Sequence, residues 1–182
     1  MVAGDGPLRA LASGGGITGP AVRAGESTKT WTFGTELCSE EPQALIEIDQ
    51  VRFETSPPVQ STDRTDDGPV VSAWLRVLAP GPDLPIGSFD GEPLELPGQV
   101  SPLSAGFALP VGQRCESEPG RARTRPVVEL LTAVTVGEPG GVVEQTWIDY
   151  RVGAKSYTLE VAWVVGLCGT SVPAGLGCRD RT

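Results

Sequence analysis

Apolar and polar residues alternate along two long stretches near the end of the chain, which predicts two neighbouring β-strands. In Ser156–Cys168, one face holds Tyr157, Leu159, Val161, Trp163, Val165 and Leu167, and the other begins with Ser156, Thr158 and Glu160. In Val142–Val152, the inward residues are Ile148, Tyr150 and Val152, and the outward residues are Trp147, Asp149 and Arg151. Each stretch therefore has a core face and a polar face, because successive strand residues point to opposite sides.

The register of this hairpin follows from its turn. A two-residue loop at Gly153-Ala154 pairs Tyr150 with Tyr157 and Ile148 with Leu159, so that both pairs share the core face. A four-residue loop also matches apolar with apolar residues, whereas a three-residue loop without a bulge does not. Gly153 supplies the positive φ that a type II′ turn requires at its first central position.

Seven strands are expected in total, and they cover Lys29–Cys38, Ala44–Thr55, Val70–Leu78, about 106–112, Val127–Val136, Val142–Val152 and Ser156–Cys168. In the second strand Ile46 and Ile48 face one way while Val51 and Phe53 face the other, which is typical of a β-bulge. The chain also holds 24 Gly and 17 Pro, too many for a mainly helical protein. The pattern predicts an all-β, immunoglobulin-like sandwich of two sheets, with a β-barrel as the alternative.

Three regions of different composition are expected along the chain. Residues 1–28 are predicted to be a flexible Gly-rich linker, 29–169 the β-sandwich domain, and 170–182 a C-terminal tail. Inside the domain, Ala79–Ser104 carries six prolines and is long for a connection. It either packs across a sheet or captures a partner, and its candidate anchors are Ile86, Phe89, Leu94 and Leu96.

Four cysteines, at positions 38, 115, 168 and 178, are expected to form two disulfides in an oxidising compartment. The alternative is four reduced cysteines in a cytosolic protein. No signal peptide is visible, so an export signal or anchor is expected to precede this sequence. The preferred pairing is Cys38–Cys168, joining the first and last strands, with Cys115–Cys178. The rival pairing is Cys38–Cys115 with Cys168–Cys178, since sequence alone does not decide connectivity.

Composition excludes several chemistries. The chain has no histidine, which removes the general base of Ser-His-Asp and Cys-His catalysis and the imidazole ligands of many metal sites. A net charge of −9 disfavours binding to nucleic acids and to anionic membrane surfaces. No run of 18 apolar residues is present, so no membrane span is expected in this sequence. We expect no cofactor.

Two charged loops are candidate binding sites. Carboxylates of Asp63, Asp66 and Asp67 could hold Ca²⁺, although their spacing differs from an EF-hand loop and a solvated acidic loop is the simpler interpretation. Three arginines alternate in a later loop, at Arg121, Arg123 and Arg125. They could grip a phosphate, a carboxylate or an acidic polymer, or simply be solvated and balanced by nearby glutamates.

The outer face of the hairpin carries two further candidates. Asp149 and Glu160 could act as an acid–base pair in glycoside hydrolysis, but Arg151 and Thr158 lie beside them and favour a cross-strand polar ladder. Trp147 could stack on a sugar ring or contact a protein partner. The alternative is that a loop or the Gly-rich N-terminal segment covers Trp147.

The order of these features gives the chain a resemblance to a known group of domains. A Gly-rich lead, a strand ending in ELC, a mid-chain cysteine and a final strand YTLEV…GLC resemble uncharacterised exported or membrane-anchored β-sandwich domains of GC-rich Gram-positive bacteria, over about residues 25–170. This resemblance implies an extracellular or cell-surface location. The expected function is a non-enzymatic interaction domain for a protein or carbohydrate partner. The alternatives are a carbohydrate-active hydrolase and a Ca²⁺-dependent adhesive module.

Overall fold

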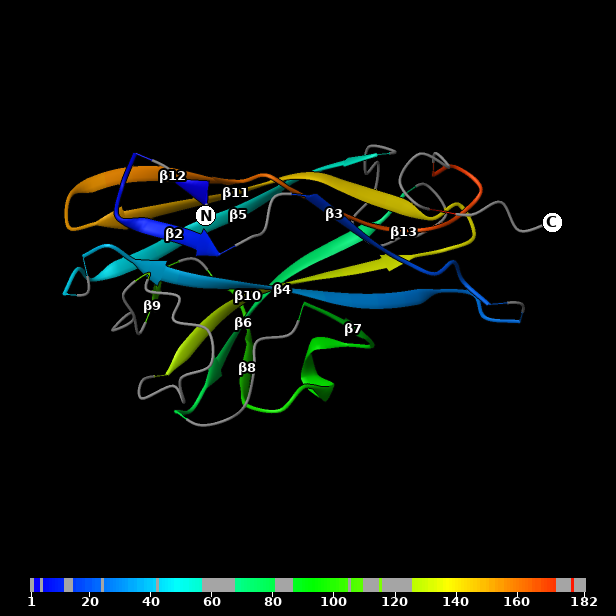
Figure 1. Cartoon of the computed structure of the whole chain (residues 1–182), viewed down its shortest axis with the longest axis horizontal. Helices are drawn as coiled ribbons and strands as arrows, with labels where there is room; N and C mark the ends of the chain where they lie inside the picture. Colours follow the sequence, from blue (N-terminus) through cyan, green and yellow to red (C-terminus); the bar gives the residue numbers. More distant parts are fainter. Residues whose placement is uncertain are drawn as a thin grey trace.

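A computed structural model describes residues 2–3, 5–11, 15–23, 25–41, 43–56, 68–80, 87–104, 106–109, 115, 126–172 and 178. These residues form two packed β-sheets, seen one above the other in Figure 1. Sheet A has the order β1 (Val2–Ala3), β2 (Leu8–Leu11), β4 (Lys29–Ser39), β10 (Val127–Val136), β6 (Val70–Leu78) and β8 (Gln99–Pro102), with β7 (Ser88–Asp90) also paired to β4. Sheet B has the order β3 (Gly15–Gly19), β13 (Trp163–Leu167), β11 (Gly141–Val152), β5 (Ile46–Ser56) and β9 (Phe107–Leu109), with β12 (Lys155–Val161) also paired to β11.

The topology is that of an immunoglobulin-like sandwich. Strands β2, β4, β10 and β6 lie in the A-B-E-D order, and the last strands (β12 and β13), β11 and β5 lie in the G-F-C order. Strand β3 runs parallel to β13, so the chain leaves the A position in one sheet and enters the other sheet beside G. The predicted fold class is confirmed, with β7, β8 and β9 as insertions between D and E.

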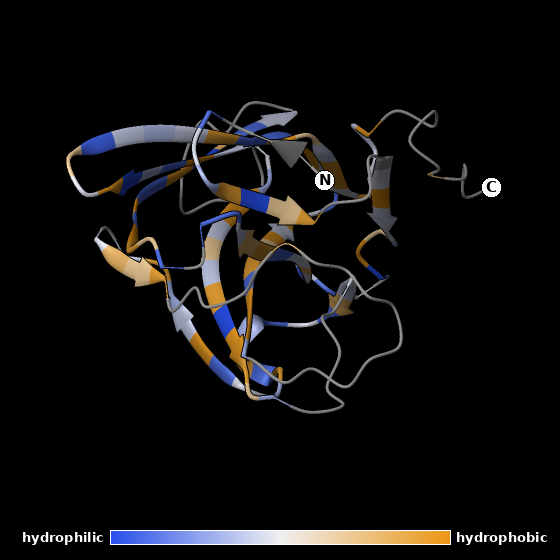
Figure 2. Cartoon of the chain, turned by 60° about the vertical axis from the view of Figure 1, so that its left-hand side comes forward, coloured by the Kyte–Doolittle hydropathy of each residue, from blue (hydrophilic) through white to orange (hydrophobic). Residues whose placement is uncertain are grey.

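The interior between the sheets is filled by the alternating apolar residues, whose pattern along the strands is visible in Figure 2. One cluster contains Leu75, Leu130, Ile148 and Leu159, and a second surrounds Phe33. Trp163 packs against both clusters and meets Phe33 edge to face, with ring centroids 6.3 Å apart. Burial of these side chains is the main stabilising contribution to the fold.

The predicted hairpin and bulge are both confirmed. Tyr150 pairs with Tyr157 and Ile148 with Leu159, and Gly153 has φ +59° at the turn. The ladder between β5 and β11 shifts register at Asp49, because Ile48 faces Tyr150 and Gln50 faces Asp149. The last strand is interrupted at Ala162, which separates β12 from β13.

Part of the segment predicted as a linker forms strands instead. Leu8 and Ala10 of β2 are fully buried in the core, and β3 pairs with the last strand. The sequence pattern missed β2 because four residues are too few to establish a period. It missed β3 because the sequence GGITG has little side-chain alternation. A Cβ at position 19 would lie 2.6 Å from Leu167 Cδ2 and 2.8 Å from the ring of Trp31, so any larger residue would displace these side chains.

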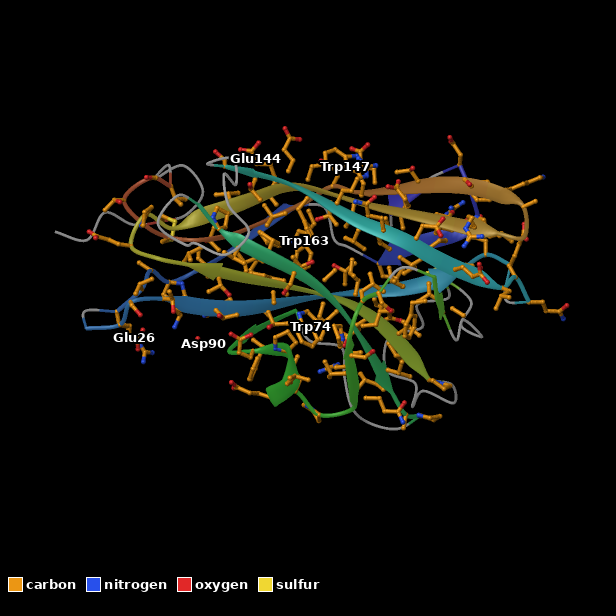
Figure 3. All side chains as sticks on the ribbon, turned by 180° about the vertical axis from the view of Figure 1, so that it is seen from behind. Glu26, Trp74, Asp90, Glu144, Trp147 and Trp163 are labelled. Carbon is orange, nitrogen blue, oxygen red and sulfur yellow. A yellow bond between two sulfur atoms is a disulfide. The ribbon has the colours of Figure 1, made fainter. Side chains whose placement is uncertain are left out.

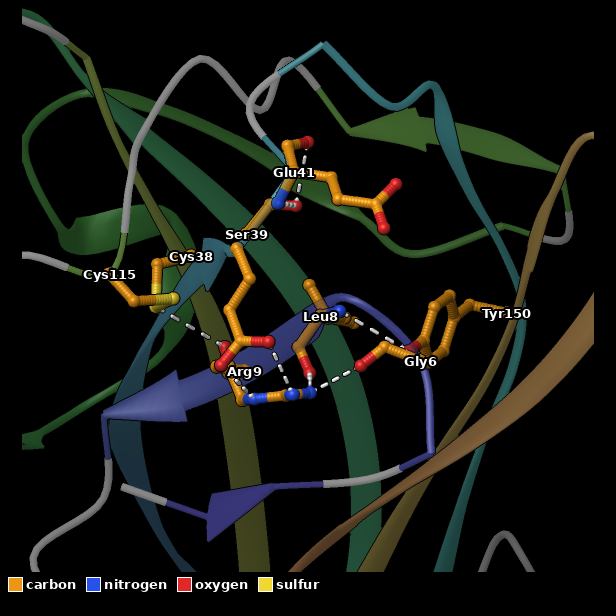
Figure 4. A network of polar contacts seen from close by, with 9 residues as sticks. Gly6, Leu8, Arg9, Cys38, Ser39, Glu41, Cys115 and Tyr150 are labelled. Carbon is orange, nitrogen blue, oxygen red and sulfur yellow. Dashed lines mark hydrogen bonds and ion pairs between the residues drawn. A yellow bond between two sulfur atoms is a disulfide. The ribbon is translucent and has the colours of Figure 1, made fainter.

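The N-terminal segment is fastened to the hairpin by polar contacts (Figure 4). The backbone N–H of Leu8 donates to the hydroxyl of Tyr150 at 3.2 Å, and burial raises the pKa of this phenol. Tyr150 stacks on Tyr157, and Gly6 packs so closely on both that a Cβ would collide with them. Arg9 forms two hydrogen bonds to Glu40, of 3.0 and 2.7 Å, and also donates to the carbonyl of Gly6.

The disulfides join Cys38 to Cys115 and Cys168 to Cys178. The preferred prediction, Cys38–Cys168, was wrong because it treated Lys29–Cys38 as the first strand of the sandwich. The strand that contains Cys38, β4, is in the B position. Gly19 packs against both Leu167 and Trp31, so the end of β13 lies near the start of β4. Cys38 is seven residues beyond Trp31, which is roughly 23 Å along an extended strand. Cys38 and Cys168 therefore lie toward opposite ends of the sandwich.

The proline-rich segment crosses the outer face of sheet A. Strand β7 borders β4, the 3₁₀ turn η1 (Pro93–Glu95) follows, and β8 borders β6 on the far side. Figure 1 shows this green segment below sheet A. Leu96 is buried as expected, whereas Leu94 is 67% exposed, and Ile86 is outside the described residues. Glu129 and Leu131 on the outer face of β10 are fully buried.

Candidate functional site

The outward side chains of β5, β11 and β12 form a polar surface with Trp147 at its centre, here called the Trp147 face. Trp147 lies directly between Arg52 on β5 and Glu160 on β12. The guanidinium carbon of Arg52 is 5.2 Å from the centroid of the indole ring, which is the geometry of a cation–π contact. Figure 3 shows Trp147 on the outside of sheet B and Trp163 between the sheets.

Asp149 holds Arg52 in this position. Its carboxylate accepts hydrogen bonds from Arg52 at 2.6 and 3.1 Å and from the hydroxyl of Thr158 at 2.7 Å. The bond from Arg52 is the main reason why the pKa of Asp149 lies below its ordinary value, and the same bond raises the pKa of Arg52. Both groups are therefore charged at neutral pH and fixed relative to Trp147.

A second ion pair extends the ladder along the strands. Arg151 donates to Asp49 at 2.9 Å and lies 3.1 Å from Glu47. Its hydrogen bond to Asp49 raises the pKa of Arg151. This contact uses the bulge residue of β5, because Asp49 is the extra residue that the register shift leaves without a partner on β11. The bulge thus aims a carboxylate at the neighbouring strand.

Asp149 and Glu160, the candidate catalytic carboxylates, are arranged as members of a cross-strand polar ladder. Asp149 faces Thr158 and Trp147 faces Glu160, so the two carboxylates are one cross-strand pair apart. Glycoside hydrolysis requires one carboxyl group with a raised pKa to act as the acid. Asp149 has a lowered pKa and two hydrogen-bond donors, which suits an ionised structural role.

The remaining sequence candidates lie outside the described residues. These are the acidic loop residues Asp63, Asp66 and Asp67 and the loop arginines Arg121, Arg123 and Arg125. Among the residues that the structure does describe, no three His, Cys, Asp or Glu side chains gather as metal ligands.

Sequence reasoning missed a groove between the edges of the two sheets. It has a volume of about 630 Å³ and lies between β5 and β6. Its lining residues are Asp49, Gln50, Val51, Phe53, Val71, Ser72, Ala73, Trp74, Pro102, Leu103 and Ser104. No sequence signal could have located it, because it depends on which strands end up as neighbouring edges.

The fold and this surface define an all-β sandwich domain with two disulfides, a kind of cross-link found mainly in extracellular proteins. Comparisons with protein-family models, with curated proteins and with solved structures found no match. Over the part of the chain that the structure describes, no helix is long and apolar enough to cross a membrane.

Proposed function

We propose that this chain is an extracytoplasmic, non-enzymatic binding domain whose partner contacts the Trp147 face. The observation that carries the proposal is the half-buried indole of Trp147 on the outer face of sheet B, held within a ladder of charges. Aromatic and arginine side chains supply most of the binding energy at protein interfaces. A surface that is already ordered loses little side-chain entropy when a partner binds.

The charges around Trp147 favour a partner that carries lysine or arginine. Glu54, Glu144 and Glu160 are exposed on or beside this face, whereas its arginines are engaged with Asp149, Asp49 and Glu47. The indole already accepts the guanidinium of Arg52. Complementary charge speeds association and selects among partners. A carbohydrate that stacks on the indole is the second candidate.

Binding arrays test this proposal. The purified domain is applied to arrays of basic peptides, of the same peptides with Lys and Arg replaced by Gln, and of glycans. We expect the basic peptides to bind, Trp147→Ala to weaken binding about 30-fold, as a hot-spot loss of about 2 kcal/mol implies, and Leu94→Ala to leave it unchanged. Leu94 is the matched control because it is an exposed apolar residue on the segment that covers the other sheet. The proposal is refuted if Trp147→Ala weakens the binding of none of these basic peptides or glycans.

Stability measurements separate a binding role from a packing role. Trp163→Ala should cost about 3 kcal/mol, at the lower end for a large aromatic in a core. Trp147→Ala should cost less than Trp163→Ala, about 1 kcal/mol, since the half-buried Trp147 indole contacts the outer face of sheet B and not the core clusters. Urea unfolding of both variants provides the comparison. Equal and large losses would show that Trp147 is part of the core, and the Trp147 face would then be the wrong surface.

A further inference from the structure

The groove between β5 and β6 has an apolar floor contributed by both sheets. Val51 and Phe53 come from β5, Val71 and Ala73 from β6, and Leu103 from the residue after β8. Its rim is polar and includes Ser72, whose hydroxyl accepts a hydrogen bond from the indole of Trp74 (labelled in Figure 3) at 2.9 Å. A volume of about 630 Å³ is within the usual range for ligand sites.

The strands that border the groove are edge strands over part of their length. Strand β9 pairs with β5 only from Ile46 to Ile48, and β8 pairs with β6 only from Trp74 to Val77. The backbone bond from Leu103 to Ala73 extends that pairing by one residue. Among the described residues, no strand pairs with 50–54 of β5 or with 70–72 of β6 on the groove side. Such an edge is a template for one more strand.

Charge adds a second restriction on what can bind. Among the described residues that line the groove, only Asp49 is charged, and it already accepts a hydrogen bond from Arg151. Arg151 also pairs with Glu47, so two carboxylates share one arginine and a negative charge is left over. Glu54 is exposed farther along the same edge. Arg52, between Asp49 and Glu54, points to the Trp147 face and is held there by Asp149. An occupant that lies along β5 therefore meets a carboxylate near each end. Opposite charges on facing strands stabilise a pair, and like charges destabilise it.

We propose that this groove binds an extended peptide with alternating apolar and basic residues, which adds to the β5 edge as a further strand. Its apolar side chains enter the groove beside Val51 and Phe53. Its basic side chains lie beside Glu54 and beside the cluster of Asp49, Glu47 and Arg151, which holds more carboxylates than arginines. Main-chain hydrogen bonds supply affinity in this mode of recognition, and the alternate side chains supply specificity. The apolar floor of this site lies on the opposite side of β5 from Trp147, although Asp49 and Glu54 also border the Trp147 face. The site adds a ligand class to the proposed function.

Synthetic peptides of about seven residues, an ordinary length for a strand, test the proposal. The probe alternates Val and Lys. The comparison peptides alternate Val and Glu, carry a central proline that cannot donate a main-chain hydrogen bond, or contain the same residues in scrambled order. Fluorescence anisotropy measures Kd for each peptide, and hydrogen exchange measures protection of residues 50–54. We expect a micromolar Kd for the Val/Lys peptide, weaker binding of the other three by tenfold or more, and new protection along β5.

Variants of the full chain locate the site. Ser104→Trp fills the mouth of the groove from an exposed position and should weaken the Val/Lys peptide by more than tenfold. Glu54→Lys should weaken it several-fold, whereas Glu26→Lys, the same charge change at an exposed residue elsewhere, should not. Trp147→Ala should leave this binding unchanged, so failure here and failure of the Trp147 face can be told apart.

Three results would overturn the proposal. The first is no binding of the Val/Lys peptide at millimolar concentration. The second is binding that Ser104→Trp does not affect. The third is protection of residues 50–54 that rises with protein concentration without peptide, together with dimers in sedimentation, which would assign the edge to a second copy of the chain.

Discussion

The ion pair between Arg76 on β6 and Glu129 on β10 is fully buried, and its loss is expected to destabilise the fold strongly. The guanidinium nitrogen and the carboxylate oxygen are 2.6 Å apart, and the two side chains are 1% and 0% exposed. They lie on the outer face of sheet A, where the segment from β7 to β8 crosses. Glu129→Gln removes one charge and leaves the other in a place that water does not reach.

The expected cost follows from the burial of the remaining charge. Loss of one partner of a buried ion pair typically destabilises a protein by about 3–5 kcal/mol. Domains of this size are stable by about 5–15 kcal/mol, so Glu129→Gln should leave the fold marginal. The double replacement Arg76→Met with Glu129→Leu removes both charges and keeps the volume. It should cost far less than either single change, because both charges are then removed from the interior together.

A surface ion pair of the same length provides the control. Arg52 and Asp149 are also 2.6 Å apart, but their side chains are 45% and 28% exposed. Asp149→Asn should therefore change the free energy of unfolding only slightly, since water solvates the charge that remains. Urea unfolding at neutral pH gives the free energy of unfolding of the wild type, of Glu129→Gln, of the double replacement and of Asp149→Asn. If Glu129→Gln and Asp149→Asn cost the same, burial does not determine the strength of these pairs and the reasoning is wrong.

Three further predictions concern the covalent links, the N-terminal segment and acid stability. Serine replacement of the Cys38–Cys115 bridge, whose cysteines are 77 residues apart, should lower the free energy of unfolding in urea by about 4.5 kcal/mol. Replacement of the Cys168–Cys178 bridge, whose cysteines are 10 residues apart, should lower it by about 2.7 kcal/mol. A reversed order would contradict the chain-entropy argument, and free thiols in the unfolded, unreduced protein would contradict both bridges. Gly6→Ala should destabilise the fold by about 1–3 kcal/mol. Gly87→Ala is the control, because there is open space around Gly87, and it should be neutral or stabilising. Equal effects of the two changes on the melting temperature would refute the close packing of Gly6. The folded pKa of Asp149 lies below 3.8, so its ion pair stabilises the protein fully above that pH and is lost as the pH falls through the lowered pKa. The free energies of unfolding of the wild type and of Asp149→Asn should therefore differ slightly at pH 6 and converge in acid. A difference that persists in acid would contradict this reasoning.

Local patterns in the sequence were sufficient for most of the sandwich. The boundaries of β6 and β10 match the predicted strands Val70–Leu78 and Val127–Val136, because each is a short apolar run bounded by glycine and proline. The hairpin register followed from period-two alternation on both sides of Gly153. These features depend only on residues close together in the chain, and sequence reasoning handles such features well.

The errors came from features that depend on distant segments. Strand β3 is a glycine-rich stretch that becomes a strand only because β13 lies beside it, so nothing local marks it. Without β2 and β3, the strand Lys29–Cys38 was placed first in the sandwich, and the disulfide prediction inherited that error. The contact of Arg52 with Trp147 was missed because the sequence does not say which strand borders β11 on its other side.

The passage of the N-terminal chain from sheet A to sheet B links the local opening of the two sheets. Strands β2 and β3 are separated by only three residues, yet β2 pairs with β4 and β3 with β13. Detachment of this segment therefore frees an edge of each sheet in one event and exposes Leu8 and Ala10. Proteins open in contiguous cooperative units, and this unit spans both layers. Amides of β4 near Cys38 and of β13 should then lose their protection with a common opening free energy, and newly freed edges are where strands of different molecules pair and aggregate.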